Sequence, residues 1–131
     1  MKLLLDTHIF LWAFLEPERL TETVAEALEA SSSELWLSPI TTWECLLLAK
    51  KGRARLEPHP EVWLRKRLEE LRPIEAPVNH EVAIESERID LAHQDPADRF
   101  LAATAVVFDL TLVTADDRLL KSKSFAVMPN K

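Results

Sequence analysis

The first fifteen residues constrain the possible folds more than any other stretch of the chain. Three consecutive leucines, residues 3–5, form an apolar run typical of a strand buried on both faces in the middle of a parallel sheet. Asp6 follows directly, and a second apolar run, residues 9–15, opens behind it. Ligands of open α/β sheets bind in the crevice at the carboxyl ends of the strands. The position of Asp6 therefore predicts a functional site, to which the rest of the chain supplies partners.

Length and composition exclude several classes of protein. A chain of 131 residues fits one domain, residues 1–131, and can bury roughly two-thirds of its unfolded surface. The single cysteine, Cys45, excludes an internal disulfide and a cysteine zinc site and fits a reducing compartment. The single glycine, Gly52, excludes glycine-rich phosphate loops. The longest apolar run has seven residues, so we expect no membrane span and predict a cytoplasmic protein.

The charge is distributed unevenly along the chain. The net charge of −6 argues against a simple basic nucleic-acid-binding surface. Residues 50–72, however, carry eight basic and four acidic side chains. The preferred interpretation of this stretch is a solvated helix face, and the alternative is a local strip that contacts phosphates.

Helices and short strands alternate along the chain. Strands are expected near residues 3–5, 35–37, 110–114 and 125–127, with a possible short one at Ile74. Helices are expected at 9–15, from the cap Thr21 to about 29, from Ser38-Pro39 to Gly52, at 60–71, from the cap Asn79 to about 91, and from Asp95-Pro96 to 108. This alternation predicts a single α/β domain with a mainly parallel sheet covered on both faces.

Four carboxylates stand out at the ends or beginnings of these elements: Asp6, Glu44, Asp98 and Asp116. Each also has a purely structural explanation. Asp6 and Asp116 could cap short helices, and Asp98 could lie favourably at the start of a helix that Asp95 caps. Glu44 fits a capping box with Thr41, although Ser38-Pro39 is the better helix start and places Glu44 inside the helix.

Taken together, the four carboxylates predict a cation site. In a parallel α/β domain these positions face the same edge of the sheet. Two carboxylates ~5 Å apart repel by about 3 kcal/mol at an effective dielectric near 20. A convergent cluster must therefore take up protons or hold cations. Oxygen ligands without histidine or thiolate suit Mg²⁺ or Mn²⁺, and such a pocket indicates phosphoryl transfer.

The motifs also resemble a known family. These are Asp6-Thr7-His8 with Leu11-Trp12, Ser38 with Thr42-Trp43-Glu44, residues 93–99 (His-Gln-Asp-Pro-Ala-Asp-Arg), and residues 112–116 (Leu-Val-Thr-Ala-Asp). They are similar to the PIN-domain ribonucleases and, more closely, to the VapC-type toxins of type II toxin–antitoxin systems. The resemblance extends over residues 1–128.

The resemblance implies a PIN-like three-layer α/β/α domain with a central five-stranded parallel sheet and a metal-dependent endoribonuclease activity. The acidic quartet of the family carries over onto Asp6, Glu44, Asp98 and Asp116, which are the expected catalytic and metal-binding residues. Mg²⁺, or Mn²⁺, would be held by the first three, with Asp116 binding directly or through water. The products would carry a 5′-phosphate and a 3′-hydroxyl. The implied partners are an RNA substrate, a cognate antitoxin and a second copy of the chain.

A few neighbouring residues are expected to support the site. Thr7 and Thr114 are expected to hydrogen-bond water or phosphate oxygens, or else to cap and pack. Arg99 is expected to pair with the acidic cluster or to contact phosphate. His8 and His93 are expected to orient neighbouring groups. The four tryptophans are expected in the core or at interfaces more often than as base-stacking platforms.

Three alternative functions differ in how well they fit the sequence. A PIN-domain RNA-processing nuclease that is not a toxin, and a catalytically idle PIN-like interaction module, remain open alternatives. A phosphoacceptor signalling domain fits poorly, because Ser38 rather than an aspartate follows the second strand. The helix after Arg99 also lacks the glutamine that relatives often carry near Thr104, which bears on substrate details rather than on the quartet.

Overall fold

The computed structural model describes all 131 residues, and its centre is a five-stranded parallel sheet. The strand order is β3-β2-β1-β4-β5, so the leucine strand at the start of the chain occupies the middle. Leu3 lies opposite Leu35 on one side and Thr111 on the other. The strands are β1 (Lys2–Leu5), β2 (Glu34–Leu37), β3 (Ile74–Glu75), β4 (Thr111–Thr114) and β5 (Ala126–Pro129).

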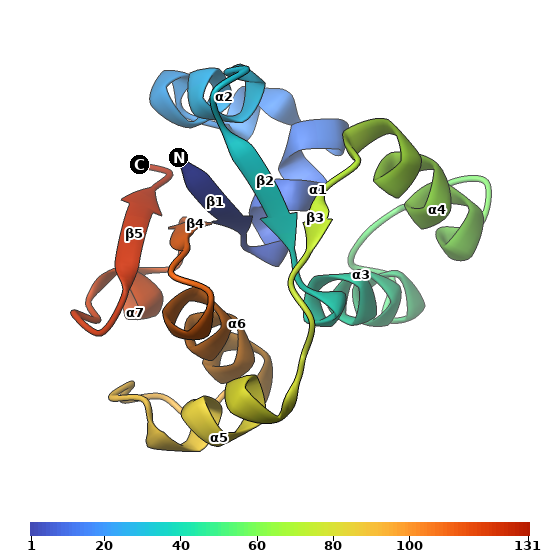
Figure 1. Cartoon of the computed structure of the whole chain (residues 1–131). Coiled ribbons are helices and arrows are strands. Elements are labelled where there is room, and N and C mark those ends of the chain that lie inside the picture. Colours follow the sequence, from blue (N-terminus) through green and yellow to red (C-terminus); the bar gives the residue numbers. More distant parts are fainter.

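Helices cover both faces of this sheet (Figure 1). The first group is α1 (Thr7–Leu15), the 3-10 helix η1 (Pro17–Arg19), α2 (Glu22–Glu29), α3 (Pro39–Lys50) and α4 (Pro60–Leu71). The second group is α5 (His80–Arg88), α6 (Pro96–Val107) and α7 (Asp117–Leu120). The chain therefore forms the three-layer α/β/α architecture that the alternation of elements and the family resemblance predicted.

The core divides along the alternation of β1. Leu3 and Leu5 point to the first group of helices, where Phe10 is fully buried and meets Trp63 edge to face at 6.2 Å between ring centroids. Leu4 points to the other face. Burying each leucine of this strand stabilises the fold by about 1.5–3 kcal/mol. All three leucines of β1 are within 1% of full burial, as expected for a strand buried on both faces.

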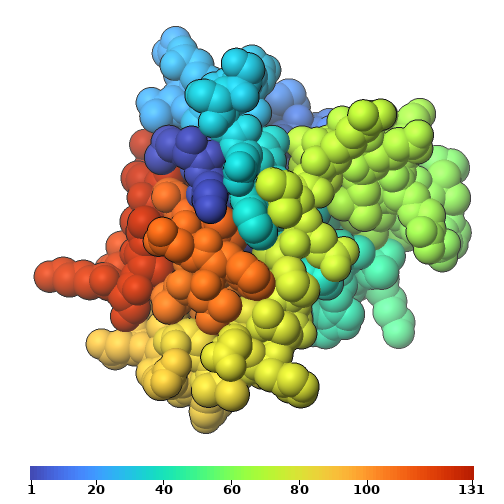
Figure 2. All heavy atoms as spheres, in the orientation of Figure 1, coloured from blue at the N-terminus to red at the C-terminus, as the bar shows by residue number.

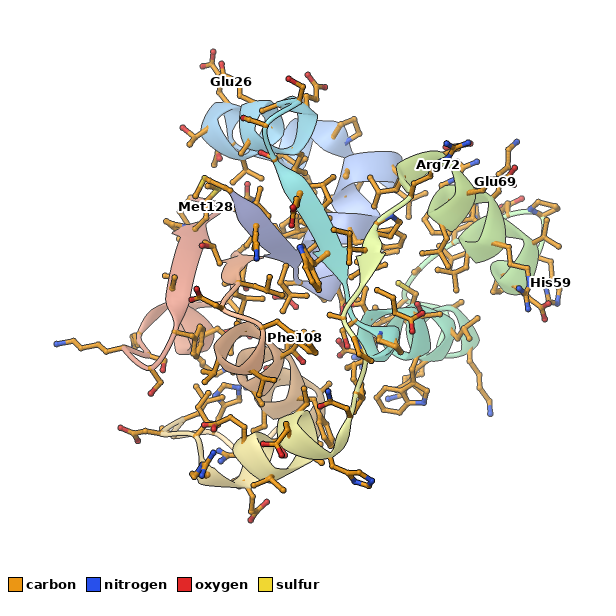
Figure 3. The ribbon with its side chains drawn as sticks, viewed as in Figure 1. Glu26, His59, Glu69, Arg72, Phe108 and Met128 are labelled. Atoms are coloured by element: carbon orange, nitrogen blue, oxygen red, sulfur yellow. The ribbon has the colours of Figure 1, made fainter.

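The second face is closed by a helix with small side chains. Ala102 and Ala105 of α6 pack beside Leu4 and Leu112, so the helix axis can approach the sheet closely. At the edge of this layer Phe108, labelled in Figure 3, packs its ring against that of Trp36 with 5.9 Å between ring centroids. The tight packing of α6 determines where its first turn, which carries Asp98, meets the sheet edge.

Three element boundaries differ from the expectations by two or more residues. Helix α1 begins at Thr7, two residues earlier, because Asp6 caps it. The last strand is Ala126–Pro129 rather than 125–127. Helix α5 ends at Arg88 rather than near residue 91, because Ile89 adopts an extended conformation and is buried against the second face. The burial of Ile89 outweighs the helical pattern of the preceding residues.

The basic stretch 50–72 contains an exposed helix face, which is the interpretation preferred from the sequence, and a separate loop. Helix α4 lies on the outside of the molecule, in the green region at the right of Figure 2, and Glu69 and His59 point away from the body in Figure 3. Arg65 pairs with Glu61 at 3.0 Å across one turn of this exposed face. No helix of the structure is both long enough and apolar enough to span a bilayer.

Candidate active site

The four carboxylates predicted from the sequence meet at one cavity of about 370 Å³, which a fifth carboxylate, Asp95, also lines. They stand at the carboxyl ends of β1 and β4, inside α3 and in the first turn of α6. The cavity is lined by Asp6, Thr7, His8, Trp12, Glu44, Asp95, Asp98, Ala115, Asp116 and Arg118. The convergence predicted from the sequence is therefore present.

Asp6 combines a structural and a functional position. It caps α1, since its Oδ1 accepts a hydrogen bond of 2.8 Å from the backbone N–H of Thr7. Its Oδ2 accepts a bond of 2.6 Å from the Thr114 hydroxyl, which comes from the neighbouring strand β4. Burial raises the pKa of Asp6, while the two hydrogen bonds oppose that rise. Thr114 therefore orients a carboxylate of the site, and its contact with water or phosphate stays a prediction.

Glu44 reaches the cavity from the second turn of α3. Ser38 caps this helix and Pro39 is its first residue, so the capping-box interpretation of Glu44 is wrong. The Thr7 hydroxyl donates to Oε1 of Glu44, and Oε2 has no hydrogen bond within the protein. Burial, together with the negative charge of Asp6, raises the pKa of Glu44 to about 7. Thr7, like Thr114, thus holds a carboxylate in place.

Asp98 lies in the first turn of α6, three residues after the cap Asp95. Oδ1 of Asp95 accepts from the backbone N–H groups of Ala97 and Asp98, which confirms that Asp95 is a helix cap. Oδ2 of Asp98 lies 3.0 Å from Nε2 of His93, and Oδ1 is free of hydrogen bonds. Burial raises the pKa of Asp98 to about 6. His93 orients a neighbouring group, as expected.

Asp116 is held differently from the other three. It caps α7 by accepting from the backbone N–H of Arg118, and the Arg118 guanidinium bonds Oδ2 at 3.0 Å. This ion pair lowers the pKa of Asp116. The same guanidinium lies 3.4 Å from Asp98, so Arg118 bridges two members of the quartet. Sequence reasoning missed Arg118; a basic residue two positions after a strand-end aspartate was the available signal.

Arg99 is not at the cavity, contrary to the expectation that it pairs with the acidic cluster. Its guanidinium instead donates to five backbone carbonyls at 2.8–3.4 Å: Ser86, Glu87, Ile89, Leu91 and His93. These carbonyls belong to the end of α5 and to the loop that follows it. Arg99 therefore ties that loop to α6, because no helical N–H is available to bond the carbonyls there.

The donor set fits a hard divalent cation. The free oxygens of Glu44 and Asp98 and the remaining lone pairs of Asp6 are carboxylate oxygens, which Mg²⁺ and Mn²⁺ prefer. In this structure, however, no three histidine, cysteine, aspartate or glutamate side chains are placed so that they could hold a metal ion together. Each carboxylate is instead held by its own hydrogen-bond donor. The raised pKa values of three of them agree with the expectation that the cluster takes up protons or holds cations.

The comparisons with known proteins agree with this geometry. Residues 3–125 match the PIN domain family. The chain is 33% identical over 117 residues to Ribonuclease VapC22 of Mycobacterium tuberculosis, with 88% of each chain covered. The fold is similar to VapBC2 from Rickettsia felis bound to a DNA fragment from its promoter, with a TM-score of 0.76, 16% identity and 98% of both chains covered. It is also similar to FitAcB from Neisseria gonorrhoeae, with a TM-score of 0.64, 28% identity, and 98% and 97% covered. The chain therefore belongs to the PIN domain family.

Proposed function

We propose that the chain is a Mg²⁺- or Mn²⁺-dependent endoribonuclease that hydrolyses RNA phosphodiester bonds. The observation that carries this proposal is the convergence of Asp6, Glu44, Asp98 and Asp116 on one cavity, with burial raising the pKa of the first three. Such a set of acids is costly to keep charged unless cations are bound there. The 33% identity to a protein named a ribonuclease supports the choice of RNA over other phosphate esters.

In this proposal the contacts of each residue of the site indicate its role. Asp6, Glu44 and Asp98 hold the cation, and Asp116, whose oxygens already bind Arg118, stands at the edge of the set. When bound, the metal activates a water nucleophile and neutralises charge on the leaving oxygen. Thr7, Thr114 and His93 keep the carboxylates oriented, and Arg118 supplies a positive charge toward phosphate.

The experiment that tests this proposal is incubation of the purified chain with total RNA and Mg²⁺, with and without EDTA. We expect fragments with 5′-phosphate ends that disappear on chelation. Metal-independent fragments, or none with Mg²⁺ and Mn²⁺ alike, would contradict the proposal. The result also discriminates against an idle interaction module, which would leave RNA intact.

The toxin role extends the same proposal. The FitAcB and VapBC2 structures and a toxin–antitoxin complex from Klebsiella pneumoniae are similar in fold, and we propose a cognate antitoxin and a homodimer for this chain. Trp43 and Leu46 of α3 expose 53% and 40% of their surface, which supports an apolar contact between copies. Growth arrest on expression, relieved by a neighbouring gene product, separates a toxin from an RNA-processing nuclease.

In this proposal residues 1–131 act as one nuclease domain, and the single buried Cys45 fits the reducing cytoplasm.

A further inference from the structure

Two further clefts continue the acidic cavity on different sides. One, here the Trp12 cleft, has a volume of about 450 Å³ and shares His8 and Trp12 with the cavity. The other, here the Lys121 cleft, has a volume of about 300 Å³ and shares Arg118 with it. Because each cleft shares lining residues with the cavity, both clefts border the acidic site.

Both clefts carry positive charge on a chain whose net charge is −6. The Trp12 cleft is lined by Arg19, Arg53 and Arg55 against one acidic residue, Glu16. Arg53 has no ion-pair partner, and the pairs that Arg19 and Arg55 make, both at 3.4 Å, are exposed. Exposed pairs of this kind contribute little and are easily exchanged for other anions. These arginines can therefore bind phosphate.

The Lys121 cleft offers a similar charge on the other side. Lys121 and Lys123 line it together with one acidic residue, Asp90, and neither lysine takes part in an ion pair. A polyanion that enters the acidic cavity is repelled there unless cations accompany it, and the two basic clefts offset that repulsion over the flanking phosphates.

An aromatic ring lines only the Trp12 cleft. The Trp12 ring is half-buried, and the Arg19 guanidinium lies over it at 4.6 Å from the centroid. The Arg19 side chain is 54% exposed, so it can move aside or stack on an incoming base. The Lys121 cleft contains no aromatic residue. The two sides of the cavity therefore offer different contacts: charge with an aromatic face on one side, and charge alone on the other.

We propose that single-stranded RNA crosses the acidic cavity from one cleft to the other, with the nucleobase on one side of the scissile phosphate stacked on Trp12. Arg53 and Arg55 contact the phosphates beyond that base, and Lys121 and Lys123 contact those on the far side. Stacking requires an unpaired base, so the path selects single strands over duplex. This inference rests on the proposed function, because it assigns the RNA path of that same site.

Trp12 also packs against the core of the first sheet face, so a loss of activity on its replacement does not by itself establish stacking. The decisive test changes the RNA as well as the protein. Wild type, Trp12→Leu and Trp12→Phe are compared on a short RNA that contains a mapped cleavage site. The RNA is used intact and in four abasic versions. Each version carries one abasic nucleotide, at one of the two positions on one side or the other of the scissile phosphate. Because the abasic nucleotide keeps the phosphates, the comparison isolates the base.

For wild type we expect one abasic position, on one side only, to lower kcat/KM about 10-fold, as the loss of a base–aromatic stack does. Trp12→Leu should lower kcat/KM on intact RNA by a similar factor, and the abasic change should then have no further effect. Trp12→Phe should restore most of the loss. A Trp12→Leu enzyme as sensitive to the abasic position as wild type, or a wild type indifferent to all four positions, would overturn the stacking assignment.

The arginines are tested separately, since both are exposed and their replacement leaves the fold intact. Arg53→Ala and Arg55→Ala should each raise KM with kcat unchanged and reduce the slope of log KM against log salt by about 0.7. Lys66→Ala removes one charge from the exposed face of α4, outside both clefts, and is the matched control. Equal effects of Arg53→Ala and Lys66→Ala on KM would show that Arg53 makes no specific contact with phosphate, and would contradict this part of the proposal.

The two proposals fail in distinguishable ways. If the chain cuts no RNA with any divalent metal, the proposed function fails. Binding of a labelled single-stranded RNA that needs no mapped cleavage site, intact or with single abasic nucleotides, is then measured by fluorescence anisotropy. Weaker binding of the abasic RNA by wild type but not by Trp12→Leu would still support the path. Equal binding of all RNAs by both proteins would overturn it.

Discussion

At the scale of single residues, the cavity carboxylates serve local structure and chemistry at the same time. Asp6 and Asp116 cap α1 and α7, and Asp98 lies in the first turn of α6. A cap uses only one lone pair of a carboxylate that offers about four, so the remaining ones can bind a cation. Structural and functional interpretations of these residues are therefore compatible rather than exclusive.

Replacing Asp98 with asparagine separates the two roles. Asparagine keeps the size of the side chain and can still accept from His93, while it removes one charge from the cluster. Without metal the free energy of unfolding should stay the same or rise slightly, since repulsion is relieved. RNA cleavage should fall by about 100-fold or more, because even the loss of an outer partner of a metal ligand costs 10–100-fold. Urea unfolding and cleavage of a labelled RNA measure the two effects.

Asp95→Asn is the matched control for this prediction. Asparagine caps a helix about as well as aspartate, and Asp95 acts as the cap of α6. We expect near-normal cleavage and a free energy of unfolding that stays the same or rises slightly, because Asp95 also lines the cavity and its charge adds to the repulsion. If Asp98→Asn cuts RNA as well as this control does, Asp98 is not a ligand.

At the scale of elements, Arg99 joins α6 to the end of α5 through the five backbone carbonyls that it bonds. Arg99→Lys keeps the charge but loses the planar fork that reaches several acceptors at once. We expect a loss of about 2 kcal/mol in the free energy of unfolding, within the range for hydrogen bonds to charged groups. Cleavage by the folded variant should persist, because the guanidinium does not line the cavity.

Arg88→Lys, at the end of helix α5 to which Arg99 bonds, provides the comparison. Arg88 forms an exposed pair with Glu85 at 2.8 Å, and its replacement should change stability by less than about 0.5 kcal/mol. If Arg99→Lys were as stable as Arg88→Lys but inactive, Arg99 would belong to the site and our structural assignment would be wrong.

At the scale of the whole molecule, the acidic cavity should make stability depend on pH. Glu44 has its pKa raised from 4.5 to about 7 and Asp98 from 3.8 to about 6. As the pH rises, the unfolded state therefore loses these two protons at a lower pH than the folded state does. Without metal, stability should fall as the pH rises from about 4 to 7, since the native state binds more protons over that window. Thermal unfolding in EDTA at a series of pH values measures this slope.

Metal and a single substitution should each alter that slope. Mg²⁺ binds the deprotonated carboxylates, so millimolar Mg²⁺ should raise Tm most near pH 7 and oppose the fall. Glu44→Gln cannot release a proton, and its stability in EDTA should vary less between pH 4 and 7. A wild-type Tm that is flat over this window, or that rises with pH in EDTA, would contradict the assigned pKa shifts.

Much of the fold and of the site could be predicted from the sequence. The leucine run identified the central strand because β1 is buried on both faces, and local cap signals placed the starts of the helices because a cap depends only on residues close in sequence. Asp6, Glu44, Asp98 and Asp116 could be named because parallel strands bring their carboxyl ends to one edge.

Only the tertiary structure decided which groups those side chains contact. Thr7 bonds Glu44 from 37 positions away, and Thr114 bonds Asp6 from 108 positions away. Arg118 was found beside Asp98 and Asp116, whereas Arg99 was found away from them. Such pairings depend on how α6, α7 and the sheet pack, and they leave no periodic signal in the sequence. Sequence alone thus determined which acids gather and at which edge of the sheet, while packing over long sequence separations decided which donors hold them and which arginine joins them.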